Sequence, residues 1–170
     1  MVPSTLFNST HRNPMNKKSI LTLTVALLAI PLAHAASVHF KGGLPKFTDL
    51  GTTLKTCFSL SGLGNMDVTI IVEAAGMIST TCTNPGGNVA PGLNKTPFRE
   101  TTQITIPSTQ IKNGNVSVCL TTQTPPTPTA VEAGCPNNNF TTSINSVDFS
   151  NATVTVVQGG QTVLQRSFTL

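Results

Sequence analysis

Apolar and polar residues alternate with a period of two through most of the chain beyond residue 38. Successive side chains of a β-strand point to opposite faces, so this alternation is typical of strands with one buried face. No long stretch beyond residue 38 has the 3.6-residue period of a helix. The pattern predicts an all-β protein with about eight strands. Alternating runs lie at 54–61, 68–75, 77–83 (a shorter run), 98–106, 116–121, 140–149, 152–157 and 163–170, and a weak first strand is expected at 38–41.

Turn-forming residues separate the predicted strands. Asn113-Gly114 tolerates the positive φ angles of a type I′ turn and predicts a hairpin over 112–115, and Gly159-Gly160 predicts another between the last two strands. The segment 124–139 contains four prolines, so it is predicted to be a long loop that cannot pair continuously. Short strands with turns at this spacing favour a single antiparallel β-sandwich, immunoglobulin-like in the broad sense.

The four cysteines, Cys57, Cys82, Cys119 and Cys135, predict two disulfides, for which three pairings are possible. We favour the pairing of neighbours in sequence, Cys57–Cys82 and Cys119–Cys135. Cys57 and Cys119 lie on the polar face of their predicted strands, and the chain has no Trp. The disulfides are therefore expected to lie outside the core, unlike the central bridge of an antibody domain, which packs against an indole.

The first 35 residues have the pattern of a secretory signal peptide. A basic segment at 15–18 precedes an apolar run at 20–32, and Ala33-His34-Ala35 is a small-x-small cleavage signal. The apolar run is shorter than the roughly 20 residues that cross a bilayer. We predict cleavage between Ala35 and Ala36, no membrane insertion afterwards, and secretion of residues 36–170 as one domain to the periplasm, the cell surface or the extracellular space. Residues 1–14 lack the character of a signal-peptide n-region, which makes Met15 an alternative start.

Removal of this leader changes the charge of the protein. The whole chain has a formal charge of +4, but Arg12, Lys17 and Lys18 belong to the leader, and the rest carries seven bases against six acids. A nearly neutral domain gives no support for binding to nucleic acid or to an anionic membrane. Its surface is rich in Thr, Ser and Asn, which allows close packing against a neighbour or a matrix.

The mature part of the chain lacks the residue patterns of most enzymes and metal sites. His39 is its only histidine, it lies next to the predicted new N-terminus, and no GxSxG motif is present. None of the cysteines forms the close CxxC or Cys/His pairs that metal sites use. No spacing marks two carboxylates as the catalytic pair of a glycosidase. The sequence predicts no catalytic residue, metal or cofactor.

The segment from Cys82 to Asn94, CTNPGGNVAPGLN, is the least generic part of the chain. Asn84, Gly86, Gly87 and Asn88 form a speculative binding loop, because successive backbone N–H groups around Pro85-Gly86-Gly87 can make an anion-binding nest. The structural interpretation is favoured, in which Asn side chains cap the turn and Gly takes positive φ. The loop lacks the Lys-Ser/Thr ending of a phosphate-binding loop.

Four motifs, spread over most of residues 36–170, give the chain a resemblance to a family of small secreted bacterial β-proteins. They are GLGNMDVT at 62–69, CTNPGGN at 82–88, IKNGN at 111–115 and VVQGG at 156–160. The resemblance implies secretion and a single β-domain. That family has no assigned activity, so the resemblance implies no functional residues.

These observations lead to the hypothesis of an exported, non-enzymatic β-sandwich protein that acts in binding, adhesion or assembly at the cell surface or outside it. Self-assembly and a surface or matrix component are the partners considered. One alternative is a fimbrial subunit of the donor-strand type, although 163–170 supplies an ordinary last strand. Another is a secreted hydrolase that uses Asp or Glu. A third is a toxin or inhibitor whose proline-rich loop at 124–139 makes the contact.

Overall fold

The computed structural model describes residues 37–170; the predicted signal peptide and its cleavage site at Ala35 and Ala36 lie outside the described residues. In this part of the chain there is no α-helix, and no helix has the length and hydropathy of a membrane span. The elements in chain order are β1 (His39–Phe40), β2 (Lys46–Asp49), β3 (Leu54–Ser61), β4 (Val68–Thr83), β5 (Val89–Pro91), β6 (Thr96–Ile106), the 3₁₀ turn η1 (Ser108–Gln110), β7 (Val116–Thr121), β8 (Thr141–Gln158) and β9 (Gln161–Thr169).

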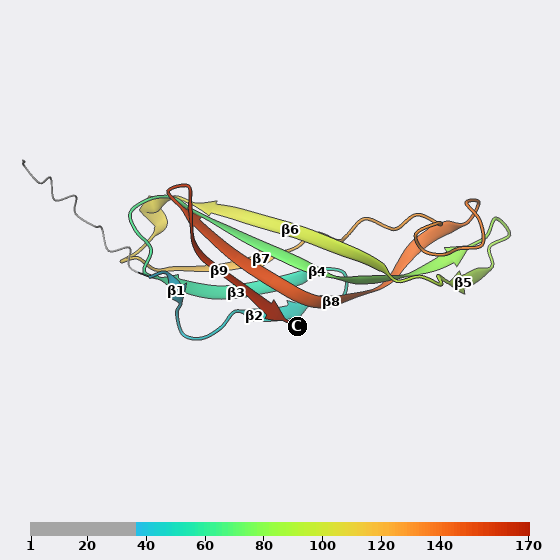
Figure 1. Ribbon diagram of the computed structural model, residues 1–170, viewed down its shortest axis with the longest axis horizontal. Helices are drawn as coiled ribbons and strands as arrows, with labels where there is room; N and C mark the ends of the chain where they lie inside the picture. The colour runs from blue at the N-terminus through green and yellow to red at the C-terminus, as the bar shows by residue number, and fades with distance from the viewer. Residues whose placement is uncertain (1–36) are drawn as a thin grey trace, which may run out of the picture. The chain divides into compact units, whose positions relative to one another are not determined.

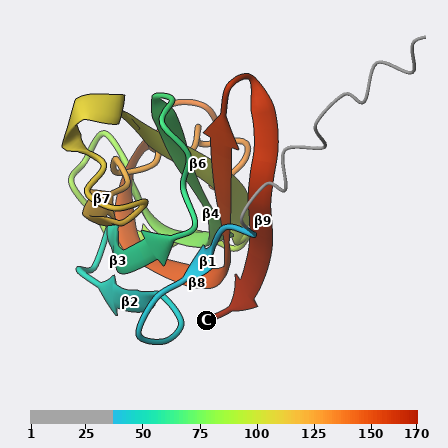
Figure 2. The ribbon, with the colours of Figure 1, turned by 90° about the vertical axis from the view of Figure 1, so that its left-hand side faces the viewer.

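The strands form two antiparallel sheets. In the smaller sheet, β3 is central, with β1 and β2 on one side and β7 on the other. In the larger sheet, β4 pairs with β6 and β5 along one side and with β8 along the other, and β9 adds to β8. Figure 2 shows the larger sheet curling around the smaller one. The all-β prediction is confirmed.

Alternating residues of both sheets supply one hydrophobic cluster. Along β3 and β4 every second side chain is buried, as the period of two predicts. Leu60 of β3 and Ile70 of β4 are fully buried and belong to the same cluster. Because the chain has no Trp or Tyr, phenylalanines make the aromatic contacts. The ring centroid of Phe168 in β9 lies 5.9 Å from that of Phe40 and 5.3 Å from that of Phe47, both in the smaller sheet.

Three details of the predicted strands are wrong. The breaks expected after residues 75 and 149 do not exist, because β4 and β8 continue through irregular pairing at Ala75 and Gly76. Two short strands, β2 and β5, were missed, while four of the predicted runs belong to only two strands, β4 and β8; nine strands are described. Asn113 and Gly114 do have the positive φ angles of a type I′ turn, 51° and 71°. However, that turn leads from the larger sheet to the smaller one and does not join two paired strands.

Two disulfides are present, but the predicted pairing is wrong. The bonds join Cys57 to Cys119 and Cys82 to Cys135. Cys57 and Cys119 lie directly opposite each other on β3 and β7, which are adjacent in space and far apart in sequence. This strand order decides the pairing, and sequence proximity does not reveal it. The expectation that the bonds lie outside the core holds for Cys57–Cys119, since Cys119 is exposed, whereas Cys82 is buried.

Candidate functional site

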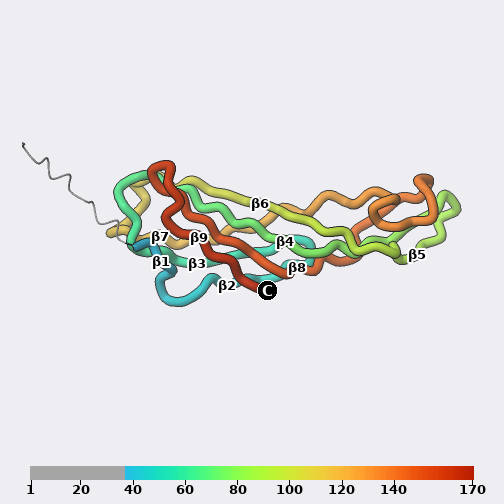
Figure 3. The backbone as a smooth tube through the Cα atoms, viewed as in Figure 1, coloured from blue at the N-terminus to red at the C-terminus, as the bar shows by residue number. Residues whose placement is uncertain are grey.

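The C-terminal part of β4 and the N-terminal part of β8, which pair with each other, extend past the smaller sheet and carry the candidate site (Figures 1 and 3). We call residues 77–97 and 124–147 the arm. In the arm, β4 pairs with β5, with the start of β6 and with β8, and the smaller sheet contributes no strand. The arm therefore depends on other contacts for its stability.

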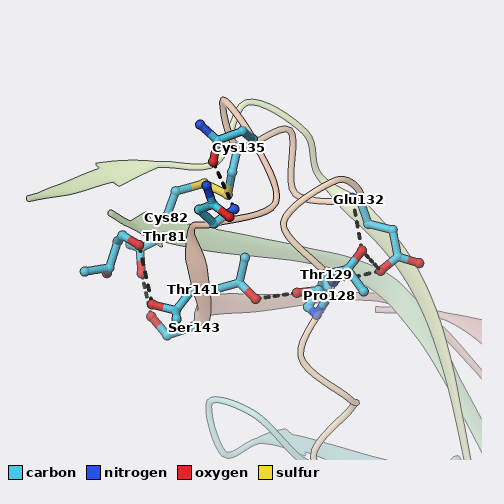
Figure 4. Close-up of a disulfide and its surroundings, with 12 residues drawn as sticks. Thr81, Cys82, Pro128, Thr129, Glu132, Cys135, Thr141 and Ser143 are labelled. Atoms are coloured by element: carbon cyan, nitrogen blue, oxygen red, sulfur yellow. Dashed lines mark hydrogen bonds between the residues drawn. A yellow bond between two sulfur atoms is a disulfide. The ribbon is translucent and has the colours of Figure 1, made fainter. Parts of the chain in front are cut away.

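The Cys82–Cys135 disulfide fixes the proline-rich loop to β4 in the arm (Figure 4). Cys82 is only 1% exposed, and Ala133, close to the bond in sequence, is fully buried. The Ala133 carbonyl oxygen accepts a hydrogen bond of 3.0 Å from the Asn94 N–H, and Thr142 Oγ1 donates one to the Pro128 carbonyl oxygen. A loop that the prolines keep out of the sheet is thus held in one place by covalent and polar contacts.

Glu132 closes a tight turn at the surface of this loop. Its Oε2 atom accepts hydrogen bonds from Thr129 N, at 2.8 Å, and from Thr129 Oγ1, at 2.7 Å. In return, Glu132 N donates to Thr129 Oγ1 at 3.3 Å, which is the reciprocal arrangement of a capping box. The bonds from the Thr129 backbone and hydroxyl lower the pKa of Glu132 below its usual value of 4.5.

This lowered pKa predicts that the turn loosens in acid. The Glu132 carboxylate stabilises the turn through these hydrogen bonds. This stabilisation is complete above pH 4.5, the usual pKa, and is lost as the pH falls through the lower pKa of the folded state. Amide hydrogen exchange at Thr129 and Glu132, normalised for intrinsic exchange, should therefore accelerate below pH 4.5 in the wild type. Glu132→Gln should abolish this pH step, and an unchanged step in the variant would assign it to another group.

A cleft lies between the proline-rich loop and the first half of β6. It has two adjoining parts of about 370 and 600 Å³, which share Thr96, Pro97 and Glu132. The rest of its lining comes from β4, the connection between β5 and β6, β6 itself and the proline-rich loop; it comprises Ile78, Leu93, Asn94, Lys95, Phe98, Arg99, Glu100, Pro126, Thr127 and Pro128. We call this the arm cleft. Leu93 of this lining and Val131, next to Glu132 in the chain, are 86% and 66% exposed and add apolar surface to the cleft.

The charged groups of the arm cleft that are not in ion pairs are carboxylates. Both cations of its lining are paired, Lys95 with Asp148 at 3.2 Å and Arg99 with Glu73. Glu100 and Glu132 have no ion pair within the described residues. The cleft therefore combines proline and phenylalanine surfaces with an excess of carboxylate. The sequence did not predict that these two carboxylates face one cleft, because only folding brings the loop to β6.

The predicted binding loop lies in the same arm, in an exposed turn. Asn84 Oδ1 accepts a hydrogen bond of 2.9 Å from Asn88 N, and the Asn84 carbonyl oxygen accepts one from Gly87 N. Gly87 has a φ angle of 81°, and Gly86 lies beside the Asn84 side chain. These contacts use the N–H groups of Gly87 and Asn88 that an anion would need, which matches the capping interpretation. The anion-binding role stays a prediction.

No protein-family model matches the chain, and no curated protein matches it in sequence. Within residues 37–170, no three His, Cys, Asp or Glu side chains lie close enough together to hold a metal ion. The two disulfides indicate folding in an oxidising, extracellular-type environment.

Proposed function

We propose that the chain is an exported, non-enzymatic β-sandwich protein that binds a partner at the cell surface or outside the cell through the arm cleft. The single observation that carries this proposal is the arm itself. Long strands extend away from the hydrophobic cluster, and the disulfide of the buried Cys82 with Cys135 holds a proline-rich loop over the first half of β6. This construction makes a concave surface on rigid elements, which is what a binding site requires. The unpaired carboxylates favour a neutral or cationic ligand.

Filling the arm cleft tests this proposal. Thr127 is exposed and lines the cleft, so Thr127→Trp should obstruct it without disturbing buried contacts. Labelled protein with both disulfides formed should bind intact cells or their extracellular matrix, and Thr127→Trp should weaken that binding by about tenfold or more, the loss expected when one central contact is removed. Thr121→Trp, at an exposed position of β7, is the matched control and should bind like the wild type. Equal binding by all three proteins would refute the role of the cleft.

Assembly by strand addition is an alternative favoured by the free edges of β6 and β7. A groove of about 530 Å³ between these strands is lined by Ile104, Ile106, Val116 and Val118. Such a groove can accept an extended segment of another chain. In the described fold, β9 completes the larger sheet from within the chain. A stable monomer at high concentration would exclude obligate assembly of this kind.

A carboxylate-based hydrolase is favoured by one observation, the presence of Glu100 and Glu132 in the same cleft. A glycosidase needs two such groups, one of them as a proton donor. Glu132 is a weak candidate for the donor, because its hydrogen bonds to Thr129 stabilise the ionised form. Turnover of a polysaccharide or glycoside substrate that disappears in Glu100→Gln would replace the binding proposal with this one.

A further inference from the structure

The outward face of the smaller sheet presents the Cys57–Cys119 disulfide to solvent. Cys119 is exposed and Cys57 is half-buried; in the other disulfide no sulfur belongs to an exposed residue, since Cys82 is 1% exposed and Cys135 is half-buried. Among the described strands β7 pairs only with β3, so its other edge is free beside Cys119. Exposed disulfides are the labile ones in proteins. We propose that Cys119 is a thiol-exchange site, at which a low-molecular-weight thiol opens Cys57–Cys119 while Cys82–Cys135 stays closed.

The strand order makes Cys119 Sγ the more accessible of the two sulfur atoms. A thiolate must approach in line with the bond, from the side opposite the leaving sulfur. Behind Cys119 lie the free edge of β7 and a groove of about 530 Å³ with Lys112 and Ser117 in its lining. Behind Cys57 lies β2, in which every residue pairs with β3 and Lys46 is directly opposite Cys57. The open approach therefore leads to Cys119 Sγ, and Cys57 Sγ is the leaving atom.

Lys46 favours the departure of Cys57. Lys46, Cys57 and Cys119 are directly opposite one another on β2, β3 and β7, so their side chains share the outward face. Lys55 lies on the same face, two residues before Cys57. The four strands of the smaller sheet contain one acidic residue, Asp49, at the end of β2. Its carboxylate accepts a hydrogen bond from Gly51 N. A nearby ammonium group lowers the pKa of a thiol and makes it a better leaving group.

The exchange takes place in two balanced steps. In the first, the thiolate forms a bond to Cys119 Sγ, the bond between Cys119 Sγ and Cys57 Sγ breaks, and its electron pair leaves on Cys57 as a thiolate. In the second, another thiolate attacks the added sulfur and releases the Cys119 thiolate. Two small thiols are then oxidised to one disulfide, and one protein disulfide is reduced.

Timed reduction with glutathione tests the proposal. The oxidised protein, isolated as a monomer, is exposed to reduced glutathione at neutral pH, quenched in acid, alkylated and mapped by mass spectrometry. Cys57 and Cys119 should be reduced at least about tenfold faster than Cys82 and Cys135, and early glutathione adducts should be on Cys119. In denaturant the two disulfides should open at similar rates, which ties the difference to the fold. Equal rates in the native protein, or adducts mainly on Cys57, would overturn the assignment.

A charge variant separates the role of Lys46 from simple exposure. Lys46→Gln leaves both disulfides in place and should slow the opening of Cys57–Cys119 by about threefold, because the leaving Cys57 thiolate loses a nearby positive charge. Lys46→Arg should restore the wild-type rate. Lys95→Gln removes an exposed lysine in the arm and is the matched control, with no expected change. An unchanged rate in Lys46→Gln would show that this lysine does not assist the leaving thiolate.

Discussion

Replacing Cys82 and Cys135 together by serine is expected to lower the free energy of unfolding by about 4 kcal/mol. The two residues are 53 positions apart, and chain entropy assigns a loss of about this size to opening a loop of that length. The arm should suffer most, because the smaller sheet contributes no strand to it. Denaturant unfolding gives the global loss, and hydrogen exchange should show lost protection at Asn94 and around Ala133 first.

The second disulfide supplies a matched comparison for this prediction. Cys57 and Cys119 are 62 positions apart, so chain entropy predicts a similar loss for Cys57→Ser with Cys119→Ser, again about 4 kcal/mol. These residues lie in two strands that stay paired through six residue pairs. Loss of hydrogen-exchange protection should therefore be confined to β7 and should spare the arm. Similar exchange patterns in the two double variants would contradict a separate clamping role for Cys82–Cys135.

The period of two predicted the faces of the strands correctly because burial acts on each residue locally. Leu54, Phe58 and Leu60 are buried as expected, and Cys57 lies on the other face. The pairing of the cysteines could not be obtained in this way, since it depends on which strands become neighbours. The same holds for the arm cleft, where residues 96–100 meet residues 126–132. The four prolines predicted a long loop that cannot pair continuously, but nothing in the sequence indicated which strand this loop covers.

Gly76 shows why the long strand β4 was predicted as two strands. Gly76 separates the alternating runs 68–75 and 77–83, and a glycine inside a strand weakens it and often marks a bulge or a close backbone approach. The structure has both features here. The pairing of β4 with β8 shifts between Ala75 and Gly76, and Ser150 donates a hydrogen bond to the Ala75 carbonyl oxygen at the same place. The irregularity bends the ladder without ending it, so β4 continues into the arm.

Gly76→Ala is accordingly expected to destabilise the protein by about 3 kcal/mol. A Cβ atom at this position would lie 2.0 Å from the Asp148 carbonyl oxygen and 3.0 Å from the Phe149 Cα atom. Both are backbone atoms of the paired strand, so no side-chain rotation can relieve the contact, and β4 and β8 would have to separate locally. Chemical denaturation should report the loss, and hydrogen exchange should show weakened protection on both sides of the irregularity.

Gly64→Ala is the matched control, because it makes the same chemical change without the backbone contact. A Cβ atom at Gly64 would have the Gln158 side chain as its nearest neighbour, at 3.5 Å, which is an ordinary contact. Its effect should stay within about 0.5 kcal/mol. If Gly76→Ala were equally mild, the close approach of β4 and β8 would not be needed for stability, and the arm could not owe its direction to this irregularity. A large loss at Gly76 alone would show that the stability of β4 and β8 at the start of the arm depends on the absence of a side chain at this position.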